Sequence, residues 1–146
     1  MNKVNYQKKL DELIDNLDGR RPSLILHGCC APCSSYCLEY LSKFFDIKLL
    51  FYNPNIGLAE EYEKRLAEVN RLIGEMELFS EVEVISGRYD TSEFYNAVRG
   101  YEHCPEGGER CLICYEMRMR EAASIAQERG AEDSCLKGKT KSILQA

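Results

Sequence analysis

The 146-residue sequence lacks hydrophobic runs of membrane-spanning length. Its longest apolar stretches, such as residues 49–52, are far below the roughly 20 residues that a transmembrane helix needs. Residues 1–6 open into a polar amphipathic segment and contain no hydrophobic signal region. These absences exclude a transmembrane role and predict a cytoplasmic chain whose thiols are reduced.

Positive charge is also scarce, since 19 Lys and Arg residues face 24 Asp and Glu residues and give a formal net charge of −5. This balance excludes an overall affinity for polyanions. It leaves open whether the arginines form a local phosphate-binding rim or lie solvated on the surface. The sequence shows no internal repeat and no low-complexity tract, and its 45% apolar content suits one core.

Cysteine, by contrast, is abundant, with eight residues in a short chain. Five of them form two clusters, one within residues 29–33 (CCAPC) and one within residues 111–114 (CLIC). A thiolate is costly to bury and is a strong ligand for iron or zinc. Two such clusters at expected turn-to-helix junctions therefore predict a metal or redox site before a packing role.

Helical and strand patterns alternate along the chain. Strands are expected at residues 23–27, 47–52 and 82–85. Helices are expected over residues 10–17, from an N-cap at Ser34, over residues 62–73, from a cap at Thr91, and over residues 111–129. This alternation predicts an α/β fold with a parallel sheet and helices on both faces, in which ligands bind beyond the carboxyl ends of the strands.

The domain organisation follows from the same pattern. We expect a single α/β metal-binding domain over residues 1–130 and an irregular, polar C-terminal tail over residues 131–146. Residues 29–33 follow the first expected strand, so the first cysteine cluster lies at the ligand-binding edge of the sheet.

The clusters allow more than one chemistry. Cys30 and Cys33 alone form a C-x-x-C motif at a helix start, which is typical of a thioredoxin-like thiol–disulfide oxidoreductase. The adjacent Cys29 favours a metal instead, because neighbouring thiols seldom form a relaxed disulfide but can both face one metal site. Cys111 and Cys114 add two thiols to the neighbouring pair Cys29 and Cys30, and a set of four suits either a [4Fe–4S] cluster or a structural zinc module.

The other cysteines have separate interpretations. Cys33 is either a fifth ligand, holding an additional metal ion or a position facing the substrate, or a small residue at a helix start. Cys37 lies one helical turn further on and is expected in the core. Cys104 either supports the site or is an ordinary loop thiol, which is the favoured interpretation, and Cys135 falls in the polar tail.

Polar side chains end each expected strand. His27 either holds the loop or acts as a proton donor beside the thiols. Tyr52 and Asn53 either bind polar groups of a substrate or belong to an Asn-Pro turn. Asp90 is a further candidate at the site, although it can equally begin a helix.

At these residues the sequence resembles the QueH-type epoxyqueuosine reductases, over about residues 5 to 130. The matching motifs are residues 27–35 (HGCCAPCSS), residues 51–56 (FYNPNI) followed by Glu60, Glu61, Tyr62 and Arg65, then Tyr89-Asp90, and residues 106–115 (EGGERCLICY) with Arg118. The resemblance implies a fold similar to the adenine-nucleotide alpha hydrolase-like (HUP) fold.

The resemblance also implies an activity and a cofactor. The activity is the last step of queuosine biosynthesis, the two-electron reduction of epoxyqueuosine to queuosine at the wobble position of tRNA. By position, Cys29, Cys30, Cys111 and Cys114 would hold the [4Fe–4S] cluster. The partners implied are tRNA with an epoxyqueuosine-containing anticodon and an electron donor, with no membrane partner.

The residues agree with this chemistry, because removing the epoxide oxygen as water needs two electrons and two protons. Cys33 is the candidate for an adjacent metal position, and His27, Tyr52 or Asp90 is the candidate proton donor. A splayed anticodon needs aromatic stacking surfaces. Tyr52, Tyr89 and Tyr101 are the aromatic residues expected to provide them.

The C-terminal tail departs from the family. The resemblance implies a further strand and a terminal Cys-Gly-Cys dithiol beyond Gly130, and the sequence contains neither. The tail reads as a truncated or frameshifted ending, which predicts the loss of sheet strands, of part of the substrate surface and of relay thiols.

Overall fold

A three-stranded parallel sheet forms the centre of the protein. The computed structural model describes residues 4–129. The strands β1 (Ser23–His27), β2 (Asp46–Phe51) and β3 (Glu83–Ser86) lie in the order β1-β2-β3. All pairs are parallel. The sequence prediction of three parallel strands is confirmed, and the expected bounds differ by at most one residue at each end.

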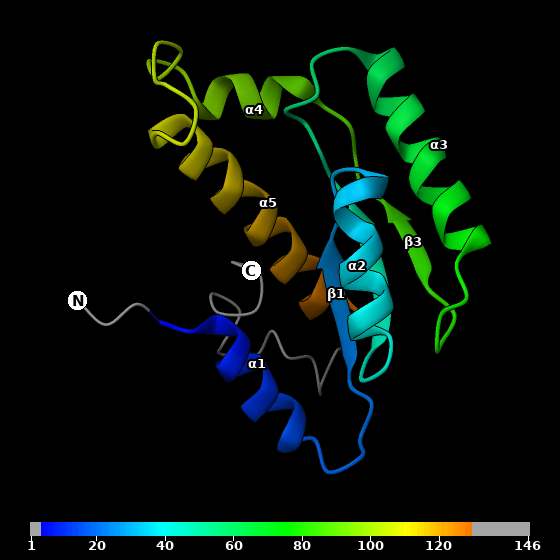
Figure 1. Cartoon of the computed structure of the whole chain (residues 1–146). Helices are drawn as coiled ribbons and strands as arrows, with labels where there is room; N and C mark the ends of the chain where they lie inside the picture. Colours follow the sequence, from blue (N-terminus) through cyan, green and yellow to red (C-terminus); the bar gives the residue numbers. More distant parts are fainter. Residues whose placement is uncertain (1–3, 130–146) are drawn as a thin grey trace.

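Five helices are described around this sheet (Figure 1). They are α1 (Tyr6–Asp15), α2 (Ala31–Leu41), α3 (Ala59–Glu75), α4 (Thr91–Ala97) and α5 (Glu109–Glu128). Crossover helices are what parallel strands require, because a tight hairpin cannot join them. The α/β class predicted from the alternating pattern is therefore confirmed.

Alternate residues of the strands face two separate cores. On one face, Leu24, Leu26 and Leu49 pack with α2 and α3 in the larger core. On the other face, Ile25 and Leu50 pack against Ala122 and Ala126 of α5. This alternation follows from the two-residue period of a strand. Helices thus cover both faces of the sheet, as the sequence predicted.

Two of the predicted helix caps are wrong. Helix α2 begins at Ala31 with Cys30 as its N-cap, and Ser34 instead lies inside the helix, where its hydroxyl donates to the Cys30 carbonyl at 2.8 Å. The first turn of a helix accommodates proline, because the backbone N–H groups of that turn have no acceptor within the helix. Pro32 occupies that turn. The helix therefore starts within the first cysteine cluster.

The second wrong cap is at α4. Asp90, not Thr91, is the N-cap, and its Oδ1 accepts hydrogen bonds from the Ser92 backbone N–H at 2.9 Å and the Ser92 hydroxyl at 2.7 Å. Both Asp and Thr are good N-caps. The sequence therefore offered two neighbouring candidates for one position.

Two remaining predictions concern membrane segments and the tail. Within residues 4–129, no helix has the length and apolar character that crossing a membrane requires. The predicted tail, residues 131–146, and Cys135 lie outside the described residues. The boundary proposed at residue 130 therefore stays a prediction.

Candidate metal centre

A tight junction joins β1 to α2 and presents the first cysteine cluster. Gly28 occupies this junction, where an added Cβ would lie 2.9 Å from Leu49 Cδ1 and 3.0 Å from Ser34 Oγ. Such contacts are closer than van der Waals packing allows, so only glycine fits without displacing a neighbour. The absence of a side chain at Gly28 lets the turn lie directly on β2 and α2.

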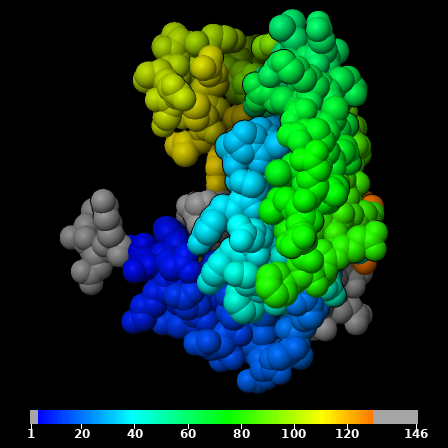
Figure 2. Space-filling view, turned by 45° about the vertical axis from the view of Figure 1, so that its right-hand side comes forward, coloured from blue at the N-terminus to red at the C-terminus, as the bar shows by residue number. Residues whose placement is uncertain are grey.

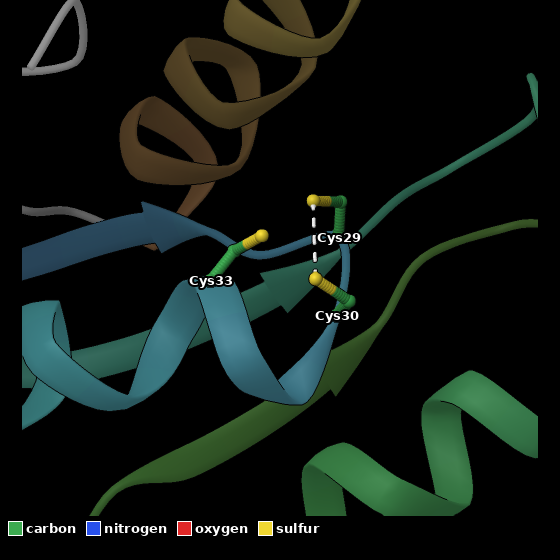
Figure 3. A group of neighbouring side chains, drawn as sticks. All are labelled: Cys29, Cys30 and Cys33. Atoms are coloured by element: carbon green, nitrogen blue, oxygen red, sulfur yellow. Dashed lines mark hydrogen bonds between the residues drawn. The ribbon is translucent and has the colours of Figure 1, made fainter.

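Three thiols meet at this junction (Figure 3). The sulfur atoms of Cys29, Cys30 and Cys33 all lie within 4.8 Å of one another. Cys29 and Cys30 are partly buried, whereas Cys33 is exposed. In the part of the chain that the structure describes, no other group of three such ligands is this close. The three thiols could hold a metal ion, because thiolates are soft ligands for iron and zinc.

The three thiols differ in their affinity for protons. Although burial opposes it, hydrogen bonds from Cys33 and Cys29 lower the pKa of the Cys30 thiol. The hydrogen bond to Cys30 raises the pKa of Cys33 to about 11, and the charge of Cys29 adds to this rise. Burial raises the pKa of Cys29. The group therefore favours one thiolate at Cys30, and a bound cation would favour the thiolate form at all three.

The second C-x-x-C motif lies at the start of α5. Cys114 is buried, and Cys111 accepts a hydrogen bond at Sγ from the Gly107 backbone N–H at 3.3 Å. Neither thiol belongs to the group of sulfurs within 4.8 Å. Of the four predicted cluster ligands, the structure thus brings Cys29 and Cys30 together, with Cys33 as their third neighbour.

Arg118 connects the two cysteine motifs electrostatically. Its Nε donates to the Cys114 carbonyl at 3.2 Å, and its guanidinium lies 5.7 Å from the ring centroid of Tyr115. Burial raises the pKa of Cys29 and of Cys114, and the charge of Arg118 opposes this rise at both thiols. One cation therefore favours the thiolate form in both motifs.

His27 ties the ends of β1 and β2 together. Its Nε2 lies 2.7 Å from the Tyr52 carbonyl oxygen, which can only accept, so Nε2 carries the proton. Burial lowers the pKa of His27 to about 4, against the effect of this hydrogen bond. The imidazole is therefore neutral near pH 7. This geometry matches the interpretation in which His27 holds the loop beside the thiols.

Asn53 makes the reciprocal tie, which sequence reasoning missed. Its Nδ2 donates to the Gly28 carbonyl at 3.0 Å, and the whole side chain is buried. The Asn53 Oδ1 has no hydrogen-bond partner among the described residues. An asparagine before a proline indicates a turn in any sequence. No local signal therefore reveals that this amide fixes the backbone next to Cys29.

The side chains of Tyr52 and Asp90 contact other groups than the thiols. The Tyr52 hydroxyl donates to Glu93 Oε2, and Tyr52 lines a cavity of about 590 Å³ together with Arg88 and Glu93. Burial and the bond to Glu93 raise the pKa of Tyr52. Asp90 is exposed and serves as the N-cap of α4. No cavity described in the structure is lined by more than one of His27, Tyr52 and Asp90, so their sharing of one rim stays a prediction.

The expected stacking surfaces are also largely occupied. Tyr52 is only 1% exposed. The ring of Tyr89 stacks on Tyr62 with centroids 4.0 Å apart, and its hydroxyl donates to the Ile56 carbonyl at 2.6 Å. Of the three predicted aromatic platforms, Tyr52 is thus buried, and the partly buried Tyr89 already stacks on a ring of the protein. Only Tyr101 is exposed, at 37%.

A second cavity, here called the thiol cavity, opens beside the cysteines with a volume of about 250 Å³. Its walls come from α1, the β1–α2 junction, α2 and α5. Residues that line the thiol cavity include His27, Cys29, Cys33, Tyr36, Tyr40 and Arg118. The thiol cavity therefore combines two thiols of the first cysteine cluster with aromatic rings and one arginine.

Comparison with known proteins identifies a family for this chain. The family described as Epoxyqueuosine reductase QueH matches residues 24–137. Proteins of that name are 36% identical in Streptococcus pyogenes serotype M1 over 132 residues and 34% identical in Thermotoga maritima over 116 residues. These alignments cover 88% and 75% of the chain.

The same alignments cover 52% and 55% of the length of these two relatives. A third relative, from Staphylococcus epidermidis, is 38% identical, and the alignment covers 56% of its length. The chain therefore spans about half the length of the curated relatives it matches. The residues that the family matches include both C-x-x-C motifs, β2, β3 and all of β1 except Ser23. The chain belongs to the QueH family of epoxyqueuosine reductases.

Proposed function

We propose that this chain provides the metal-binding half of an epoxyqueuosine reductase. The reaction is the reduction of the epoxide of epoxyqueuosine in the tRNA anticodon to the alkene of queuosine, with release of water. The observation that carries this proposal is the group of three thiols within 4.8 Å at the carboxyl end of a parallel sheet. Ligand sites of open α/β sheets lie at this edge.

We propose a [4Fe–4S] cluster on Cys29, Cys30, Cys111 and Cys114, with Cys33 at a neighbouring open position for an additional metal ion. The donor set fits, because all five groups are thiols and clusters of this type are held by cysteine. Further support comes from Arg118, whose charge acts on both Cys29 and Cys114. When bound, such a cluster supplies electrons one at a time.

The chain's own residues position the site and hold protons. Gly28, His27 and Asn53 fix the turn that carries the thiols. Of the three predicted proton donors, His27 alone lines the thiol cavity, so it is the candidate for relaying to the opened epoxide oxygen a proton that its neutral ring first takes up. Cys33 is the exposed thiol of the three, so a substrate can reach it.

The proposed partners follow from the reaction. The substrate is a tRNA whose anticodon base is splayed from its neighbours, and an electron donor supplies two electrons per turnover. A reductase of this kind works in the cytoplasm, where tRNA is modified. The order β1-β2-β3 of the parallel sheet is compatible with a HUP-like fold, which we propose on the resemblance.

The test is an epoxide-reduction assay on tRNA that contains epoxyqueuosine, with a chemical reductant and protein purified without oxygen. Queuosine is measured in the nucleosides after digestion. We expect wild-type protein to form queuosine and Cys30→Ala to form none. Cys104→Ala is the matched control, because Cys104 lies outside the three-thiol group, and it should behave as wild type.

The outcomes separate this function from its alternatives. A fully active Cys30→Ala protein would overturn the proposal. Metal-free protein that instead reduces a disulfide substrate through Cys30 and Cys33 would favour the thioredoxin-like oxidoreductase. Inactive protein that holds one zinc ion and loses stability with a chelator would favour the structural zinc module.

A further inference from the structure

Helix α2 carries an aromatic ladder that leads away from the thiols. Tyr36 and Tyr40 lie one helical turn apart, and their rings stack with centroids 6.0 Å apart and an interplanar angle of 13°. Phe44, just beyond the end of α2, continues the ladder, with its ring edge-on to Tyr40 and the two ring centroids 5.7 Å apart. Residues three and four positions apart share a helix face. Cys33, Tyr36 and Tyr40 therefore form one row along the wall of the thiol cavity.

The inner member of this pair is anchored. The Tyr40 hydroxyl lies 3.4 Å from Asp11 Oδ1, to which it donates, and it accepts from Gln7 Nε2 at 3.4 Å. Its ring is held between Tyr36 and Phe44. Tyr40 thus gives Tyr36 a fixed support, which reduces the conformational entropy that binding a ligand to Tyr36 would remove.

The outer member presents its ring to solvent. Tyr36 is 69% exposed, which is unusual for a large aromatic side chain that stacks on a neighbour. Its only ring partner among residues 4–129 is Tyr40, on one face. A planar group can therefore stack on the opposite face of Tyr36 without displacing any contact of the protein.

The opposite wall of the cavity adds a positive charge. Arg118 and the Tyr115 ring beneath it come from α5. Figure 2 shows a hollow between α1 (blue) and the segment that begins α5 (yellow), with α2 (cyan) at its right-hand side. At about 250 Å³ the thiol cavity is smaller than the roughly 300–1,000 Å³ of pockets for drug-sized ligands. It suits one planar group, with the rest of a large ligand outside.

We propose that Tyr36 is the stacking platform for the unstacked target base of single-stranded RNA, with its substituent directed toward Cys33. The inference rests on the proposed function and names the residue that receives its substrate. Bases stack on aromatic side chains whatever their sequence, and a nearby arginine favours the phosphates. Tyr36 thereby takes the role that the sequence assigned to Tyr52, which is buried, and to Tyr89, which stacks on Tyr62.

The test is the binding of a fluorescently labelled, unmodified anticodon stem-loop RNA to metal-loaded protein, followed by anisotropy at fixed low salt. Tyr36→Leu should raise Kd about 5- to 150-fold, the range that corresponds to about 1–3 kcal/mol per stacked base. Tyr36→Phe keeps the ring and should keep the wild-type Kd. Tyr95→Leu is the matched control, since Tyr95 is 56% exposed on α4 and does not line the thiol cavity.

Metal content is measured on the same samples. We expect Tyr36→Leu to hold as much iron as wild type, so that weaker binding reports the platform and not the cluster. A Tyr36→Leu protein that binds RNA as wild type does, or a Tyr95→Leu protein that weakens binding equally, overturns the inference. Wild-type protein that binds no RNA overturns it too, and the tRNA reduction assay then decides separately whether the proposed function also fails.

Discussion

At the scale of single residues, Asn53 holds the backbone directly before the thiols. Its amide is fully buried and its Nδ2 donates to the Gly28 carbonyl, directly before the thiol turn. A buried carbonyl that loses its donor has no water to replace it. The stability of the β1–α2 junction and the position of Cys29 therefore depend on one side chain.

We predict that Asn53→Ala lowers the free energy of unfolding by about 1–3 kcal/mol, because it leaves the Gly28 carbonyl unsatisfied. Urea unfolding at pH 7 measures this change. Asn70→Ala is the control, since the Asn70 amide also donates to a carbonyl, that of Leu66, but at an exposed site on α3. Equal losses for the two variants would contradict the role given to Asn53.

Glu93 is the second residue whose environment gives a test. Hydrogen bonds from Arg88 and Tyr52 lower the pKa of its carboxyl group. Its folded-state pKa lies below its unfolded-state pKa, so its stabilising contribution is fully present above the unfolded value. That contribution is lost as the pH falls through the folded value.

Glu93→Gln should therefore lower the free energy of unfolding near pH 7 by about 1 kcal/mol, and the difference from wild type should shrink in acid. Thermal unfolding between pH 7 and pH 3 measures it. Glu75→Gln, which removes an exposed carboxylate paired with Arg71, should cause no measurable change. A difference that grows in acid would refute the sign of this linkage.

At the scale of elements, the start of α2 is set by close packing against β2. Gly28 lies where a Cβ would meet Leu49 and Ser34, so the junction has no space for a side chain. The same packing places Cys30 at the N-cap and Cys33 in the first turn. The helix start and the thiol group are therefore one structural feature.

We predict that Gly28→Ala lowers the free energy of unfolding by about 1–3 kcal/mol, the usual effect of overpacking. Gly74→Ala is the matched control: it lies inside α3 with no atom within 4 Å of its added Cβ, so it should raise stability by about 0.5–1 kcal/mol. Urea unfolding of both variants measures the pair. A Gly28→Ala protein as stable as wild type would contradict the close approach.

At the scale of the whole molecule, one helix covers the second face of the sheet. Ala122 and Ala126 of α5 are buried against Ile25 and Leu50. The same helix carries Cys111 and Cys114 at its start. Packing at one end of α5 therefore controls where the second cysteine motif lies, and small residues let the helix lie close to the strands.

Ala122→Leu should test this connection. We predict a loss of about 1–3 kcal/mol in the free energy of unfolding and a lower iron content, because the larger side chain displaces α5 from the sheet. Ala123→Leu places the same side chain on the exposed face of α5 and should keep both values. Iron analysis and urea unfolding measure the pair. Full iron loading of a destabilised Ala122→Leu protein would show that α5 and the site are not coupled.

The sequence predicted those features that local patterns encode. The bounds of β1, the parallel order and the helices on both faces follow from alternating apolar residues and turn signals. The thiol group at the end of β1 follows from the spacing of Cys29, Cys30 and Cys33. The predicted ligand set that joins Cys29 to Cys111 stays a prediction, since it depends on packing between distant segments.

Tertiary contacts account for what the sequence could not predict. Tyr52, directly after β2, is enclosed, whereas Tyr36, within α2, is 69% exposed. Only the packing of α4 and α5 around Tyr52 separates them. Asn53 likewise differs from an ordinary turn residue only through the distant Gly28 carbonyl.

The central claim is that these thiols hold an iron–sulfur cluster, and its most direct test is metal analysis. Wild-type protein purified without oxygen is assayed for iron, acid-labile sulfide and zinc, and its visible spectrum is recorded. We predict a brown protein with a broad visible absorption band and about four irons and four sulfides per chain. Colourless protein that carries one zinc ion, or no metal at all, would contradict it.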